Sequence, residues 1–163
     1  MAPKFENVNY EFRNMQFPIG LKEMRAITSD LSWFERNFYK HIVGIIEKQY
    51  GAEVSIHYFG LAHSDIFKTL FIVVTDTDVG LISAKGFIIV LDVVLLRIHN
   101  EEILSVEYDI STNPDPSILN PGILYIEVDE GQGITQKFTF NNVLKENIQM
   151  LEDLIKERAN LIL

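Results

Sequence analysis

Four histidines and two closely spaced aspartates are the residues of this chain best suited to chemistry. The histidines are His41, His57, His63 and His99. His57, with the His63-x-Asp65 pair that follows it, could in principle supply imidazole and carboxylate ligands to a metal ion. The sequence contains no Glu-x-x-His or His-Glu-x-x-His motif, however, and His57 lies within an apolar strand pattern. We therefore expect no metal site and no cofactor.

The two aspartates, Asp76 and Asp78, lie at turn spacing in a Thr-Asp-Thr-Asp segment. A calcium site needs about six to eight oxygen ligands, and no Asp-x-Asp-x-Asp-Gly loop follows, so we expect a solvated hairpin turn. Gly131 and Gly133 lie between two strand patterns, which indicates another hairpin and not a phosphate loop. The chain also lacks cysteine and any Gly-x-Ser-x-Gly motif. We expect a protein that is not an enzyme.

The charge of the chain is unevenly spread. Its 163 residues are 47% hydrophobic and 23% charged, as in globular proteins, and carry a net charge of −9. Residues 1–50 hold seven Lys/Arg and six Asp/Glu, whereas residues 51–163 hold seven and seventeen. Nucleic acid and anionic lipid are bound by clustered Lys/Arg. We expect neither as a partner, and only the N-terminal third leaves room for a local basic patch.

No segment of the sequence is apolar for long enough to cross a membrane. The longest apolar run, residues 87–96, contains Asp92 and is about half the length of roughly 20 residues that a span needs. The first residues carry no apolar segment typical of a secretory signal. These features predict a soluble, cytoplasmic protein without membrane insertion.

Residues 30–50 are the clearest helix. Ser29 or Asp30 can cap it, and Ser32 with Glu35 fits an S-x-x-E capping box one turn further on. Gly51 is placed to end the helix. One face is apolar and the opposite face is polar, as shown by Leu31, Phe34, Phe38, Ile42 and Ile45 against Arg36, Lys40, Gly44 and Glu47.

The apolar stripe of this helix is wider than one contact requires. Trp33, Tyr39, Val43 and Ile46 extend it, which suggests one contact with a sheet and a second with another helix or subunit. The residues before the helix contain scattered aromatic side chains and end in Pro18 and Gly20, which break the chain. We interpret residues 1–20 as an arm laid over the core, with docking onto a second copy as the alternative; the rings are Phe5, Tyr10, Phe12 and Phe17.

A train of short strands follows the helix. Turn signals at residues 60–65 and 111–122 interrupt it. Residues 86–96 are too apolar for a strand with one wet face, so we expect burial on both faces or a partner on the outer face, with a bend that exposes Asp92. The expected strands are residues 54–59, 67–74, 79–84, 86–96, 102–110, 123–128 and 134–140. Asn141 or Asn142 is expected to cap a final helix with an apolar seam of Leu144, Ile148, Leu151 and Ile155.

Several of these segments resemble bacterial pleckstrin-homology-like (PH-like) and GRAM-like domains. TLFIVVTDTDVGLI is similar to their first hairpin, EEILSVEYDI to the strand that they begin with an ipledIxsVe phrase, GILYIEVDEGQGITQKFTF to the closing hairpin and NVLKENIQMLEDLI to the final helix. The resemblance covers about residues 67–158. It implies a barrel that binds lipid headgroups, peptides or proteins. Phosphoinositide-binding members carry Lys/Arg in the first hairpin loop, whereas residues 75–78 here are acidic, which argues against anionic lipid as a ligand.

The expected fold is therefore α+β. An antiparallel PH-like β-barrel or curved sheet would be closed by the C-terminal helix, with an additional N-terminal helix. Residues 1–52 would form an arm and amphipathic helix packed on the barrel of residues 53–163, as one structural domain.

Two functions are compatible with this fold. The first is a non-enzymatic interaction module that binds a protein partner or itself, with a homodimer expected. Its candidate contact residues are Trp33, Tyr39, Val43 and Ile46 on the helix and Glu101 and Glu102 in an acidic cluster. The alternative is a protein that binds a metabolite or nucleotide, in which Tyr58, Tyr108 and Tyr125 would stack on the ligand and Lys68, Lys85 or Arg97 would contact an anionic group.

Overall fold

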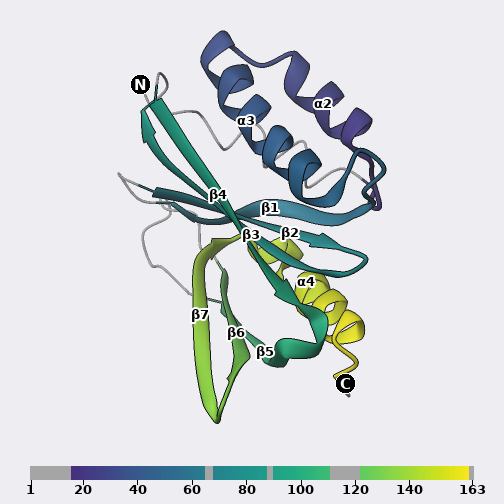
Figure 1. Cartoon of the computed structure of the whole chain (residues 1–163), viewed down its shortest axis with the longest axis vertical. Helices are drawn as coiled ribbons and strands as arrows, with labels where there is room; N and C mark the ends of the chain where they lie inside the picture. Colours follow the sequence, from purple (N-terminus) through teal and green to yellow (C-terminus); the bar gives the residue numbers. More distant parts are fainter. Residues whose placement is uncertain (1–15, 65–67, 88–89, 111–121, 162–163) are drawn as a thin grey trace.

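The computed structural model describes residues 16–64, 68–87, 90–110 and 122–161 of the chain. Within these ranges the fold is α+β, with seven antiparallel strands and three α-helices (Figure 1). The elements in chain order are α2 (Leu21–Ser29), α3 (Trp33–Tyr50), β1 (Ile56–Ser64), β2 (Lys68–Thr75), β3 (Asp78–Phe87), β4 (Val90–His99), the 3₁₀ turn η1 (Asn100–Glu102), β5 (Ile103–Ile110), β6 (Gly122–Gly131), β7 (Ile134–Val143) and α4 (Lys145–Arg158). Most of the predicted N-terminal arm and of the predicted loop at 111–122 lies outside the described residues.

The strands form two sheets. One has the order β1-β2-β3-β4 and the other the order β5-β6-β7, all antiparallel between sequence neighbours. The sheets approach each other at β1 and β7, where His63 Nδ1 lies 2.6 Å from Asn141 Oδ1. Within the described ranges no hydrogen-bonded strand pair joins the two sheets. The described residues therefore form two antiparallel sheets and no closed barrel.

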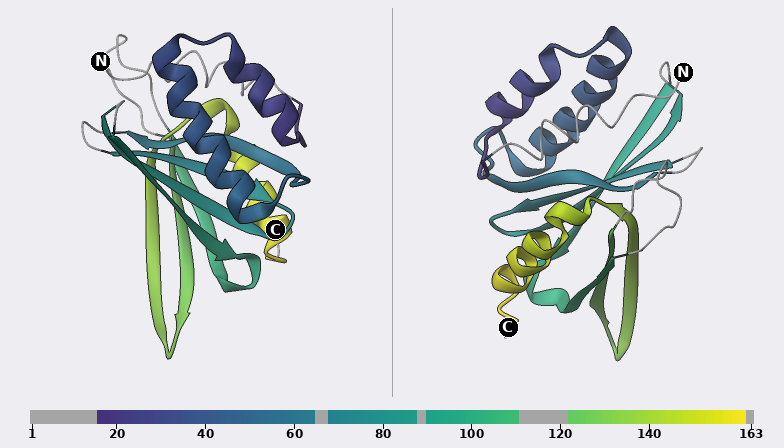
Figure 2. Two further views of the ribbon diagram at one scale, coloured as in Figure 1. Left: turned by 45° about the horizontal axis from the view of Figure 1, so that its top comes forward. Right: turned by 180° about the vertical axis from the view of Figure 1, so that it is seen from behind.

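The four-stranded sheet separates two hydrophobic cores. The helices α2 and α3 cover one of its faces, while the three-stranded sheet and α4 lie against the other (Figures 1 and 2). The helix-side core includes Met24, Ile42 and Phe71, all fully buried. The second core is closed by α4, whose Leu151 and Ile155 are also fully buried. Each strand of the shared sheet therefore sends alternate side chains into different cores.

The C-terminal end of α3 agrees with the sequence prediction, and its N-terminal end agrees with the predicted Ser32/Glu35 box. The expected caps Ser29 and Asp30 are wrong, because Ser29 is the last residue of α2 and Asp30 is its C-cap. Ser32 is the N-cap residue, and its hydroxyl accepts the Glu35 N–H at 3.5 Å. Gly51 ends the helix with φ of 92°, a conformation that L side chains rarely adopt. The shorter helix α2 was missed by the sequence reading. Leu21 and Met24 are buried one turn apart, and the Gly20 N–H donates to Glu23 at 3.0 Å, a helix-start pattern that the preceding Pro-Gly break obscured.

The second apolar contact of α3 is α2 of the same chain. Tyr39, Val43 and Ile46 are at most 2% exposed, within the core that α2, α3 and the four-stranded sheet share. As candidate partner-binding residues these three are therefore wrong, because their side chains are already packed internally. Trp33, in contrast, is 60% exposed at the start of α3.

Two local predictions are wrong. The turn expected at 60–65 is strand as far as Ser64. A Cβ at Gly60 would lie 2.5 Å from the Tyr58 hydroxyl, so this glycine marks a close approach inside a strand and not a turn. The asparagines expected to cap α4, Asn141 and Asn142, lie within β7, and Leu144 occupies the N-cap position without a side-chain cap.

The apolar run at 86–96 becomes β4 and the strand end before it. Its expected burial on both faces is wrong in the described part, because Val94 and Leu96 are exposed whereas Val93 and Leu95 pack toward the helix-side core. Asp92 is exposed within a continuous strand, so the expected bend is absent.

Candidate anion-binding groove

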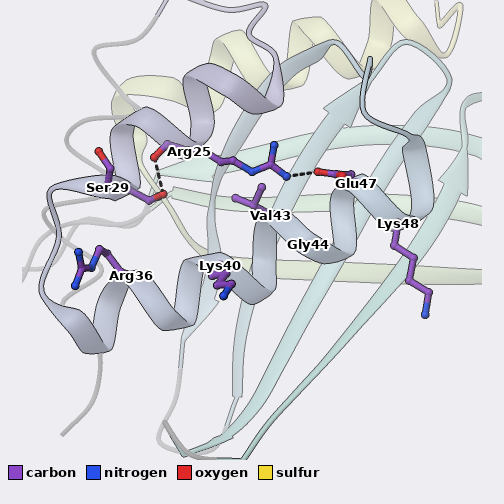
Figure 3. Close-up of a pocket in the computed structure, with 9 residues that line it drawn as sticks. Arg25, Ser29, Arg36, Lys40, Val43, Gly44, Glu47 and Lys48 are labelled. Atoms are coloured by element: carbon purple, nitrogen blue, oxygen red, sulfur yellow. Dashed lines mark hydrogen bonds and ion pairs between the residues drawn. The ribbon is translucent and has the colours of Figure 1, made fainter.

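A groove of about 710 Å³ lies between α2 and α3 (Figure 3). It opens on the side of the helix pair where the polar face of α3 meets the end of α2. Its lining residues come only from these two helices: Arg25, Thr28, Ser29, Arg36, Lys40, Val43, Gly44, Glu47 and Lys48. Four of them are basic and one is acidic, in a chain whose net charge is −9.

One of the four cations is neutralised within the groove. Arg25 of α2 forms an ion pair with Glu47 of α3 (Figure 3). The pair links the two helices at one end of the groove. Among the described residues, the side chains of Arg36, Lys40 and Lys48 have no hydrogen-bond or ion-pair partner. These three cations are therefore available to a ligand.

The free cations follow a single row on α3. Arg36, Lys40, Gly44 and Lys48 are spaced four residues apart, which places them on one inclined ridge of the helix. At about 1.5 Å rise per residue, each step is about 6 Å and the row is about 18 Å long. The arrangement is an elongated strip of positive charge and not a compact pocket around one anion.

Gly44 leaves the middle of this row open. A Cβ at this position would meet no atom within 4 Å, so packing does not require glycine. Glycine in a helix interior is less stable than alanine by about 0.5–1 kcal/mol. The missing side chain deepens the groove between Lys40 and Lys48.

The sequence carried a signal for this groove. The pattern of α3 places Arg36, Lys40 and Gly44 opposite the apolar stripe, in the N-terminal third where the charge distribution leaves room for a local basic patch. The groove also needs Arg25, Thr28 and Ser29 from α2, the helix that the sequence reading missed.

The acidic hairpin turn between β2 and β3 lies outside the groove. The prediction that it is solvated is correct for Asp76 and wrong for Asp78. Asp78 is fully buried. The Tyr50 hydroxyl donates to it at 2.6 Å and Arg97 Nε at 2.5 Å, so this carboxylate joins α3 to β4. The hydrogen bond to Asp78 raises the pKa of Arg97. Burial, followed by the hydrogen bond to Asp78, raises the pKa of Tyr50.

Asp76 is exposed and faces the other side of the sheet. His57 Nε2 lies 2.6 Å from it, and Arg158 donates to it at 3.3 Å. The hydrogen bond with His57 lowers the pKa of Asp76, and the charge of Arg158 acts in the same direction. The turn is therefore an internal link to the end of α4 on this side.

No group of three or more His, Asp or Glu residues within the described ranges could hold a metal ion; Asp65 of the candidate pair lies outside them.

The residues predicted to bind a small ligand do not converge. Tyr58 is buried in the second core, where burial raises its pKa to about 12, and Tyr108 packs against that core from β5. The Lys137 ammonium lies 4.8 Å from the ring centroid of Tyr125, which is only partly buried on β6. Arg97 is occupied by Asp78 and lies over the Tyr50 ring at 4.6 Å. The four residues form no common site.

The predicted acidic contact residues lie elsewhere. Glu101 and Glu102 belong to η1 and line a second groove of about 490 Å³ together with the exposed acids Asp129 and Glu130 near the end of β6. In the described part of the chain, no helix is both long and apolar enough to span a membrane.

Comparison with known proteins gives a full-length relative. The chain is 24% identical over 161 residues to the SPbeta prophage-derived uncharacterized protein YokE of Bacillus subtilis (strain 168). The match covers 98% of this chain and 99% of that protein, so it includes the helix pair as well as the strands. No family model matches the chain. No solved structure matches it either.

Proposed function

We propose that this protein is a non-enzymatic interaction module of PH-like architecture that binds an acidic, extended segment of a protein partner in the groove between α2 and α3. The observation that carries the proposal is the row of free cations Arg36, Lys40 and Lys48 over the open position at Gly44. In a chain with nine surplus negative charges, such a row is a local exception that favours an anionic ligand.

The strand order supports the PH-like part of the proposal. Four antiparallel strands and then three follow one another as neighbours, and an amphipathic helix comes last. The buried face of α4, with Ile148, Leu151 and Ile155, packs into the core that contains residues of both sheets. This is the layout that the resemblance over residues 67–158 implies. The binding groove belongs to the helix pair, which lies outside that stretch.

The spacing of the cations supports an extended occupant. Successive positions in the row are about 6 Å apart. In an extended peptide, side chains on one face repeat every two residues, at about 6.6 Å. Acidic residues at alternate positions would therefore face successive positions of the row, and each charge pair would be partly desolvated by the groove.

The proposal is tested with a fluorescein-labelled peptide of about eight residues that has glutamate at alternate positions and alanine between them. We expect saturable binding by fluorescence anisotropy that weakens as salt rises from about 50 to about 200 mM. The double variant Arg36→Glu/Lys40→Glu should weaken binding about tenfold or more. Gly44→Gln, which fills the row without changing its charge, should also weaken binding, whereas Gly44→Ala should not.

Matched controls separate site binding from general attraction. Lys22→Glu/Lys145→Glu changes the net charge equally at exposed positions outside the groove and should leave the affinity within about twofold. Equal losses in both double variants would contradict a specific groove. A peptide isomer with glutamates four residues apart should bind more weakly, and tighter binding of that isomer would overturn the extended occupant. Tighter binding to phosphatidylserine vesicles or to single-stranded DNA would overturn a protein occupant.

A further inference from the structure

The strand β4 is an edge strand whose pairing with β3 is regular along its whole length. It pairs with β3 from Asp78↔His99 to Phe87↔Val90 without a register shift. The other three edge strands, β1, β5 and β7, each carry at least one register shift in their pairing. Bulges twist an edge away from a further strand. Among the described strands none pairs with the outer edge of β4, so its outward amide and carbonyl groups form a regular template for another strand.

Two apolar side chains beside this edge are exposed. Val94 is 55% and Leu96 50% exposed, two residues apart on the same face of β4. Edge strands are usually protected by charged residues or proline. From Val93 to Leu96 the sequence is Val-Val-Leu-Leu, without such protection. The edge therefore offers backbone hydrogen bonds and an apolar contact at the same place.

An acidic groove continues this apolar pair along the strand. Leu96, Ile98 and Phe138 supply its apolar walls, and its carboxylates are Glu101, Glu102, Asp129 and Glu130. The one basic residue in the lining, Arg97, is already bound to the buried Asp78. The free charge around the groove is therefore negative, opposite in sign to the groove between α2 and α3.

We propose that β4 accepts an extended segment of a protein partner as an added strand. The segment carries apolar residues at alternate positions where it runs beside Val94 and Leu96, and Lys or Arg at alternate positions where it reaches Glu101 and Glu102. Main-chain hydrogen bonds then give affinity, and the change from apolar to basic side chains sets the register. This surface lies on β4 and η1, and the proposal does not depend on the groove between α2 and α3.

The test uses a labelled peptide of about eight residues with valine at alternate positions in one half, lysine at alternate positions in the other half, and threonine between them. We expect saturable binding and slower amide hydrogen exchange in residues 92–99 when the peptide is bound. Val94→Thr/Leu96→Thr keeps side chains suited to a strand but removes apolar surface, and Glu101→Gln/Glu102→Gln removes the charge. Each double variant should weaken binding about tenfold.

Two controls match these variants. Ile110→Thr/Ile134→Thr removes apolar side chains that are 50% and 57% exposed on other strands, and Asp153→Asn/Glu157→Gln removes two exposed carboxylates from α4. Neither should change the affinity. Absence of binding at about 1 mM peptide, equal losses in the controls, or exchange protection confined to residues outside 92–102 would overturn the proposal. A concentration-dependent dimer that Val94→Thr/Leu96→Thr abolishes would overturn it in favour of a second copy as the occupant.

Discussion

Asp76 and Asp78 show how two residues of one type, two positions apart, take different roles. In β-structure alternate residues share a face, but Asp76 lies in the turn and Asp78 begins β3, and their carboxylates diverge to opposite sides of the four-stranded sheet. Asp78 is buried against Arg97 and Tyr50 on the helix side. Asp76 stays exposed and contacts His57 and Arg158 beside α4. A buried carboxylate requires such partners, because an unpaired charge is expensive to remove from water.

The lowered pKa of Asp76 predicts a pH effect on stability. A carboxylate whose pKa is lower in the folded state favours folding above its unfolded pKa of about 3.9, and this contribution is lost as the pH falls through the folded pKa. We therefore expect wild type to lose more stability than Asp76→Asn between about pH 5 and pH 2. Because Asp76 is largely exposed, the difference should be below about 1 kcal/mol.

The measurement is urea denaturation followed by far-UV circular dichroism across that pH range. Asp153→Asn, at an exposed position on the wet face of α4, is the control and should follow the wild-type curve within about 0.5 kcal/mol. If wild type and Asp76→Asn lose the same free energy of unfolding as the pH falls, the contacts with His57 and Arg158 do not favour the ionised form of Asp76 in solution.

At the scale of single elements, two glycines predict opposite effects of the same substitution. Gly44→Ala should stabilise the protein by about 0.5–1 kcal/mol, because the new Cβ meets no atom within 4 Å and alanine is the better helix former. Gly80→Ala on β3 should destabilise it, because a Cβ there would lie 2.6 Å from the Tyr50 hydroxyl and 2.7 Å from a methyl group of Val73.

Urea midpoints of both variants check this prediction. Similar destabilisation by both substitutions would mean that Gly44 has a packing role that the structure does not show. If Gly44→Ala is instead stabilising and still binds the acidic peptide, glycine is not needed for the fold of α3, and the open position leaves room for the ligand above the row of cations.

The elements that the sequence predicted well are those whose pattern is local. The ends of α3 follow from Ser32, Glu35 and Gly51, and β6 follows from the alternation of buried Leu124, Ile126 and Val128. The errors arise where a distant contact decides the outcome. Gly60 looked like a turn, although it only makes room for the Tyr58 hydroxyl. Asn141 looked like a cap, although it pairs with His63 across the junction of the sheets.

The candidate site was less predictable for the same reason. Arg36, Lys40 and Gly44 were placed correctly on the polar face of α3, but a polar face alone is the usual state of a surface helix. It becomes a groove only because α2 lies beside it, and the groove keeps a positive charge because Arg25 of α2 pairs with Glu47. That information depends on the tertiary position of α2, which no spacing within α3 contains.

For the whole molecule, the central fact is that one sheet serves two cores. Phe71 and Ile72 are adjacent in β2, yet Phe71 packs under α2 and α3 while Ile72 packs toward α4. Unfolding of the four-stranded sheet would therefore expose the buried side chains of both cores. The two proposed surfaces of opposite charge lie on different parts of this arrangement, one on the helix pair and one at the edge of the shared sheet.

This arrangement predicts that the helix pair and the strands unfold together. Met24→Ala in the helix-side core and Leu151→Ala in the second core both remove a fully buried side chain, and each should cost about 2–5 kcal/mol. Met150→Ala, on an exposed methionine of α4, is the control and should stay within about 0.5 kcal/mol of wild type.

Far-UV circular dichroism reports on all elements, and fluorescence of Trp33, the single tryptophan, reports on α3. The two signals should give coincident urea transitions in wild type and in both core variants. If Met24→Ala moves the fluorescence transition to a lower urea concentration than the main circular dichroism change, α2 and α3 unfold as a separate unit. That result would contradict the prediction, because a helix pair that packs on a sheet shared with the second core should not unfold by itself.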